Sequence, residues 1–130
     1  MPFELCCLLI ACLIPVALVL MLAAGRISTP GGLQWGLGNR ETPMLFAPWL
    51  ERGARAYSNA IENLPTFVGL VLLAAFLHKL GPLTAWGCGL FVAGRVGHAL
   101  FLLAGIRWWR TIAWFVALVG DALVAIAIVR

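Results

Sequence analysis

The sequence predicts an all-α integral membrane protein, folded as a bundle of four membrane-spanning helices. Apolar residues make up 63% of the 130-residue chain, whereas soluble domains contain about 45 to 50%. A helix needs roughly 20 residues to cross a bilayer, so the chain has room for four spans and short connections. We therefore expect one domain over residues 1–130.

The first predicted span covers residues 3–24, which are nearly all apolar, and Pro15 is its expected kink. Glu4 stands near its start, where a secretory signal peptide carries Lys or Arg, so we interpret the segment as a retained helix. Residues 25–48 have four glycines in their middle and three prolines. That composition predicts a loop.

Three further spans follow this loop. The second is expected over residues 49–78, with Pro65 inside it. Gly81 and Pro82 mark a turn, and the third span is expected over residues 83–104. Gly105 ends it, and the fourth is expected over residues 107–129.

Positive charges are distributed unequally between the two ends of these spans. The connections after the first and third spans, with the span starts that follow them, carry Arg26, Arg40, Arg52, Arg55, Arg107 and Arg110. The opposite side carries only Lys79 and Arg130. The positive-inside rule places the arginine-bearing loops in the cytoplasm and both termini outside it. The net charge of +4 thus reflects topology, and no motif indicates a nucleic-acid partner.

A polar stripe runs along the second span. Arg52, Arg55, Asn59 and Glu62 follow one another at i, i+3, i+7 and i+10, so a helix places them on one face. Arginines in such positions could serve only as anchors at the membrane surface. Ionisable residues inside a bilayer are costly, however, and by default they indicate a functional site.

The third span carries Arg95 and His98, three residues apart on one helix face. At 1.5 Å per residue, Glu62 lies roughly 16 Å along its helix from Glu51, and Arg95 roughly 14 Å from Ala104. We therefore expect Glu62 and Arg95 to pair, either to fix helix register or to bind a ligand. His98 alone is equally compatible with simple packing.

The fourth span places Arg110, Trp114 and Asp121 on one face. Asp121 lies deep in the span, and the sequence assigns it no role. The four cysteines stand in apolar runs without the spacing of metal ligands. We interpret them as packing thiols and expect no metal site.

Three motifs together carry a family resemblance. They are Glu51-Arg52-x-x-Arg55-Ala56-x-x-Asn59-x-x-Glu62-Asn63-x-Pro65, then Arg95-Val96-x-His98, then Arg110-Thr111. This pattern resembles the MAPEG family, the membrane-associated proteins in eicosanoid and glutathione metabolism, and within it a bacterial-type microsomal glutathione transferase. The likeness extends over all four spans.

The resemblance implies a homotrimer of four-helix bundles in a bacterial inner membrane, with glutathione bound between neighbouring subunits at the cytoplasmic side. A lipophilic second substrate would arrive from the bilayer. The residues implied in glutathione binding are Arg55, Asn59, Glu62, Arg95 and His98. Those implied near the reacting thiol are Arg110 and Thr111.

The chemistry of the residues agrees with these implications. Glutathione carries two carboxylates, one ammonium and a thiol. Arginine binds carboxylates through bidentate hydrogen bonds, and Glu62 suits the ammonium. A free thiol has a pKa of about 8.5, and a cation such as Arg110 beside it favours the reactive thiolate.

Two positions depart from the pattern of characterised relatives. Leu102 stands where several of them have tyrosine, four residues after the histidine, and Trp114 stands where eicosanoid-forming relatives tend to have tyrosine. Two functions therefore stay open. One is a glutathione-dependent enzyme that conjugates or reduces lipophilic electrophiles or lipid hydroperoxides. The other is a non-catalytic membrane scaffold or a subunit of a larger membrane complex.

Overall fold

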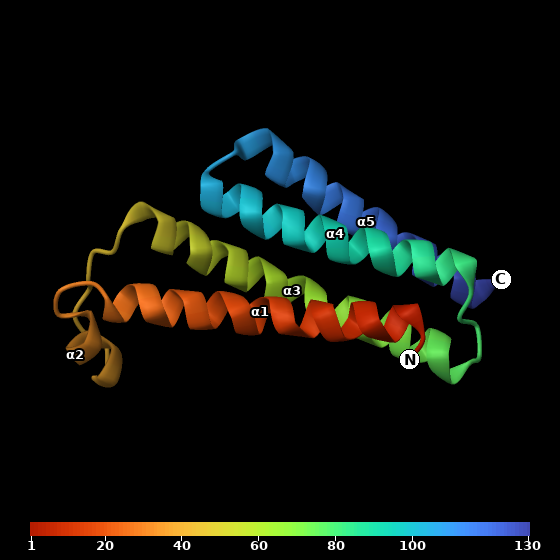
Figure 1. Cartoon of the computed structure of the whole chain (residues 1–130), viewed down its shortest axis with the longest axis horizontal. Helices are drawn as coiled ribbons and strands as arrows, with labels where there is room; N and C mark the ends of the chain where they lie inside the picture. The colour runs from red at the N-terminus through yellow and green to blue at the C-terminus, as the bar shows by residue number, and fades with distance from the viewer.

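Four long helices and one short helix make up the fold. The computed structural model describes residues 1–130 and contains α1 (Phe3–Ile27), α2 (Gly32–Leu37), α3 (Pro48–Phe76), α4 (Pro82–Ala104) and α5 (Arg107–Val129). All but α2 are long and apolar enough to cross a membrane. The predicted all-α class with four spans is therefore confirmed. Figure 1 shows the long helices side by side, each running against the next in the chain.

The short helix α2 was not predicted, because residues 25–48 have the composition of a loop. Gly31 precedes it with a φ of 77°, a backbone conformation that favours glycine. The indole Nε1 of Trp35 donates a hydrogen bond to the carbonyl of Thr42 at 2.8 Å. The same ring packs edge-on against Phe46, with centroids 5.1 Å apart. Contacts of Trp35 with later residues of the same connection thus accompany a short helix in a glycine-rich segment. The prediction of a loop is wrong for residues 32–37.

The helix ends follow their local sequence. Pro48 and Pro82 occupy the first turns of α3 and α4, where proline's missing N–H costs nothing. Gly105 ends α4 with a φ of 78°, the left-handed C-cap for which glycine is preferred. Only Gly105 and Ile106 separate α4 from α5. These two helices therefore form a tight hairpin.

Glycines bring the backbones of α4 and α5 together, and this pair makes the most extensive helix contact in the bundle. A Cβ atom added at Gly94 would lie 2.6 Å from the carbonyl oxygen of Ala113. One added at Gly87 would lie 2.8 Å from the carbonyl oxygen of Gly120. Small residues at such contacts let membrane helices approach closely, so α4 and α5 behave as one packed unit.

The apolar core lies among all four long helices, because buried residues of α1, α3, α4 and α5 contribute to it. The rings of Phe67 and Phe91 stack with centroids 3.8 Å apart, and both are fully or almost fully buried. Val71 and Val124 are buried in the same core. Near the termini, the hydroxyl of Thr84 lies 2.7 Å from a carboxylate oxygen of Glu4, and both side chains are buried. This contact joins the start of α1 to that of α4.

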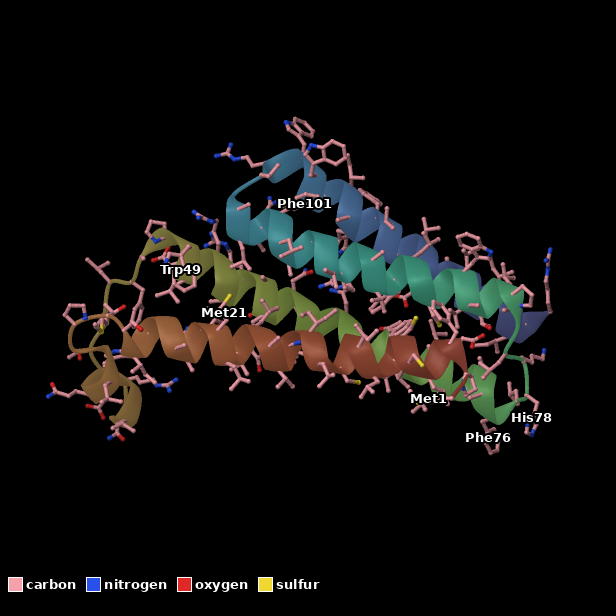
Figure 2. All side chains as sticks on the ribbon, in the orientation of Figure 1. Met1, Met21, Trp49, Phe76, His78 and Phe101 are labelled. Atoms are coloured by element: carbon pink, nitrogen blue, oxygen red, sulfur yellow. The ribbon has the colours of Figure 1, made fainter.

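The two ends of the bundle differ in charge. Figure 1 shows both termini at one end, with the α1–α3 and α4–α5 connections at the other. In Figure 2 Trp49 lies at the connection end, and Phe76 and His78 lie at the terminal end. The loop arginines therefore share one end, as the predicted topology requires. The membrane side that this end faces remains a prediction, as does the single domain.

Candidate functional site

A cavity lined by four arginines opens at the connection end, between the start of α3 and the α4–α5 turn. Its volume is about 260 Å³. The arginines come in pairs from two helices, and the full lining is Arg52, Arg55, Leu102, Gly105, Ile106, Arg107 and Arg110. No carboxylate lines it. We call it the arginine cavity.

The α4–α5 turn fixes one of these arginines. The Nε of Arg52 donates a hydrogen bond to the carbonyl of Leu103 at 3.0 Å. A Cβ at Gly105 would lie 3.8 Å from the guanidinium carbon of Arg52. This single bond to Leu103 leaves four of the five guanidinium N–H groups available to an anion.

The start of α5 adds to the positive character of the cavity. Ile106, the residue that precedes α5, makes no side-chain capping hydrogen bond. The first N–H groups of a helix have no partner within it, and the helix dipole makes this end partly positive. Ile106, Arg107 and Arg110 all line the cavity. Backbone and side chains therefore both favour a negatively charged ligand.

Arg55 and Arg110 are the two predicted site residues that line the arginine cavity, and both are largely exposed. Thr111 is exposed on α5, and its hydroxyl donates weakly to the carbonyl of Arg107 at 3.4 Å. It does not line the cavity. Sequence reasoning placed Arg52 on the polar stripe but assigned neither Arg52 nor Arg107 to the ligand, although their charge and their place at span starts were visible signals.

Arg95 is buried deeper in the bundle, with 4% of its surface exposed. Its Nη2 donates a hydrogen bond to the side-chain oxygen of Asn59 at 2.7 Å, which joins α4 to α3. Its Nη1 is buried without a partner.

The expected pairing of Glu62 with Arg95 is not found within the subunit. Glu62 is exposed, and the hydrogen-bond partner of Arg95 is Asn59. Three residues turn a helix by about 300°, so Glu62 is rotated roughly 60° away from the direction in which Asn59 points. Glu62 and Arg95 lie at similar depths along their helices, but the side chain of Glu62 does not point toward Arg95.

Two more polar groups of α4 and α5 are buried without partners. His98 is 7% exposed, and its Nδ1 has no hydrogen bond. The Oδ1 of Asp121 likewise has none, and its carboxylate lies within electrostatic range of Arg95. Buried polar atoms are normally hydrogen-bonded. Arg95, His98 and Asp121 therefore retain capacity for water, a ligand or a neighbouring subunit.

The two positions that depart from the family pattern have different surroundings. Leu102 is buried and forms an apolar part of the cavity lining. Trp114 does not line the cavity and packs edge-on against Phe115, with ring centroids 5.1 Å apart. The cavity therefore has a cationic rim and one apolar wall.

The sequence comparison establishes the family. The model of the MAPEG family matches residues 3–130, almost the whole chain. The chain therefore belongs to the MAPEG family. No curated protein matches its sequence.

Proposed function

We propose that this member of the MAPEG family is a glutathione-dependent membrane enzyme. It conjugates glutathione to lipophilic electrophiles or reduces lipid hydroperoxides that reach it through the bilayer. The family includes glutathione-dependent enzymes as well as non-catalytic members. The observation that carries the proposal is the arginine cavity, which presents four cations and a helix N-terminus without any carboxylate.

The cavity suits the anionic groups of glutathione. Arg55 lies one turn from Arg52 on α3, so two planar guanidinium groups are available for bidentate contacts with a carboxylate. We assign Arg110, at the start of α5, the role of stabilising the thiolate of glutathione. Each unit by which it lowers the thiol pKa from about 8.5 corresponds to about 1.4 kcal/mol of thiolate stabilisation. Thr111 is assigned beside it on the α5 face.

The outward polar stripe of α3 supports assembly as a homotrimer. Arg55 and Glu62 are exposed on the isolated subunit, although both belong to a membrane-spanning helix. Exposure of ionisable groups to lipid is costly, so a neighbouring subunit is the expected cover. Glu62 would then face the ligand ammonium between subunits, with Asn59, Arg95 and His98 behind it.

Leu102 favours a second candidate, a non-catalytic scaffold or subunit of a larger complex. It places an apolar side chain in the cavity lining, and the hydroxyl of Thr111 bonds within its own helix. No hydroxyl-bearing residue lines the cavity. Thiol activation therefore depends on the arginines and the start of α5 without a hydroxyl, and loss of that activation would leave a binding protein.

Arg110→Leu tests the enzyme directly. We expect turnover to fall more than about tenfold, because a thiol pKa returning from about 6.5 to about 8.5 removes most thiolate at neutral pH. Glutathione affinity should change little, because other arginines hold the carboxylates. Ultraviolet absorbance of the bound thiolate across pH is the measurement, and Arg130→Leu at the opposite end is the control.

Two outcomes of that titration count against the proposal. An unchanged thiolate titration in Arg110→Leu would remove Arg110 from the mechanism. Glutathione binding without any thiolate signal near neutral pH, in the unmodified protein, would favour the scaffold.

Arg55→Ala separates binding from chemistry. We expect the free energy of glutathione binding to weaken by about 1.5 to 3 kcal/mol, the range for a hydrogen bond to a charged group. Calorimetric titration measures the change, and size-exclusion chromatography checks that assembly is intact. Unchanged affinity would place the carboxylate elsewhere.

The proposed site faces the cytoplasm of a bacterial inner membrane, with both termini on the other side. Gly36 is a suitable reporter position, because a Cβ there would meet no atom within 4 Å. A membrane-impermeant thiol reagent should label Gly36→Cys in inverted vesicles and not in intact cells. Labelling in intact cells would reverse the topology.

A further inference from the structure

A second hollow lies between the end of α1 and α2, separate from the arginine cavity. Its volume is about 260 Å³, and it shares no lining residue with the arginine cavity. Val19 and Ala23 of α1 and Leu33 and Leu37 of α2 supply apolar walls. Its only charged lining residues are Arg26 and Arg40. We call it the α2 hollow.

Aromatic rings hold both arginines of the α2 hollow. The guanidinium carbon of Arg26 lies 5.7 Å from the centroid of the Phe46 ring, and that of Arg40 lies 5.3 Å from the Trp35 ring. Such cation–π contacts restrain a guanidinium without neutralising its charge.

Neither arginine has its charge neutralised within the chain. The Nε of Arg26 is buried without a hydrogen-bond partner, and Arg40 makes only a long bond, 3.4 Å, to the carbonyl of Gly36. No carboxylate lines the hollow. Most of the ten guanidinium N–H groups therefore remain available to an anion.

The walls of the hollow continue toward the bilayer. Val19, Ala23 and Ile27 recur every four residues along the outer surface of α1, so they form one apolar row that leads from Arg26 into the span. Leu33 and Leu37 on α2 are 49% and 81% exposed. Apolar side chains exposed on a short helix beside a span end are suited to the membrane interface.

We infer that the α2 hollow binds an anionic phospholipid. Its phosphate lies between Arg26 and Arg40, and one acyl chain follows the row from Ile27 to Val19. Arginine binds phosphate oxygens through charge-assisted, bidentate hydrogen bonds. A headgroup with an added cation would meet two uncompensated guanidinium groups, so zwitterionic phospholipids bind less well. Free phosphate leaves the apolar walls unused. This site is independent of the proposed glutathione chemistry.

The test is lipid retention by the full chain, purified in detergent micelles and analysed by native mass spectrometry. Phosphatidylglycerol and phosphatidylcholine with identical acyl chains are supplied in equal amounts. We expect the unmodified protein to retain phosphatidylglycerol preferentially. In the double variant Arg26→Gln, Arg40→Gln the preference should fall by about tenfold. Arg130→Gln, which removes one arginine from the opposite end, should leave it unchanged.

The double variant could fail to fold, so a second measurement uses the protein with both arginines intact and follows the fluorescence of Trp35. Phosphatidylglycerol with brominated chains should quench Trp35 more than brominated phosphatidylcholine does. The Trp35 signal is the difference between the unmodified protein and Trp35→Phe. Helical circular dichroism of every variant is compared in parallel.

Three results would overturn the inference. The first is equal retention of the two lipids by the unmodified protein. The second is displacement of bound phosphatidylglycerol by millimolar inorganic phosphate, which would identify a site for free anions. The third is loss of the oligomer in the double variant with an unchanged lipid preference, which would assign the hollow to subunit contact.

Discussion

The polar residues of α3 and α4 face different surroundings. On α4, Arg95 and His98 are buried within the subunit, and Arg95 has a hydrogen-bonded partner on α3. On α3, Arg55 and Glu62 are exposed, although they flank Asn59 on the same stripe. Asn59 makes the only side-chain hydrogen bond between the polar residues of α3 and those of α4. The α4 groups are thus partly satisfied by the fold itself, whereas Arg55 and Glu62 of α3 depend on something outside the subunit.

The largest expected effect on stability comes from removing the hydrogen bond between Asn59 and Arg95. Asn59→Leu removes the hydrogen-bond acceptor of a buried guanidinium, so the free energy of unfolding should fall by about 1.5 to 3 kcal/mol. Thermal unfolding in micelles, followed by circular dichroism, measures it. Ser58→Leu, at the adjacent exposed position, is the matched control. Equal stability of the two variants would show that Arg95 does not depend on Asn59.

A smaller effect of opposite sign is expected at His98. Its Nδ1 is buried without a partner, and an unsatisfied buried polar group costs about 1 to 3 kcal/mol. His98→Leu should therefore raise the unfolding free energy of the ligand-free protein by about 1 kcal/mol. Glutathione should stabilise this variant less than it stabilises the unmodified protein, if the ligand supplies the missing partner. A destabilised variant would mean that His98 is already satisfied.

The smallest effect on the subunit is expected at Glu62. Because its carboxylate is exposed and forms no ion pair in the chain, Glu62→Gln should change the unfolding free energy by less than about 0.5 kcal/mol. Its effect should be on assembly or on glutathione affinity instead. Light scattering and calorimetric titration report these separately. A large loss of stability in an isolated subunit would show that Glu62 reaches a partner inside the bundle.

The spans were predictable because the membrane imposes one simple rule, a long apolar helix for each crossing. The α4–α5 turn was equally readable, since Gly105 occupies a left-handed conformation that favours glycine. The helix α2 could not be predicted from the sequence. It is accompanied by the contacts of Trp35 with Thr42 and Phe46, and no local propensity records contacts of that kind.

The site was predictable in its residue types and less so in its pairings. Arg55 and Arg110 line one cavity at the connection end of the bundle, and the sequence could place them at that end because the rise of 1.5 Å per residue fixes depth along a helix. The motif did not fix which stripe residue points at α4, so Asn59 takes the place expected for Glu62. Arg52 and Arg107 join the cavity through the tight α4–α5 turn. That convergence is a property of the fold.

The glycine contact between α4 and α5 has a consequence for how the chain enters the membrane. An arginine near the centre of a span adds about 2.5 to 3.5 kcal/mol to the free energy of insertion, and Arg95 lies near the middle of α4 (Pro82–Ala104). The two-residue connection and the close backbones of Gly87, Gly94 and Gly120 let α5 follow immediately. Asp121 on α5, whose Oδ1 has no hydrogen-bond partner in the bundle, then reaches the membrane together with Arg95, so a negative charge accompanies the positive one. We expect the last two spans to insert as one hairpin, and a chain truncated before α5 to leave α4 unintegrated at the translocon.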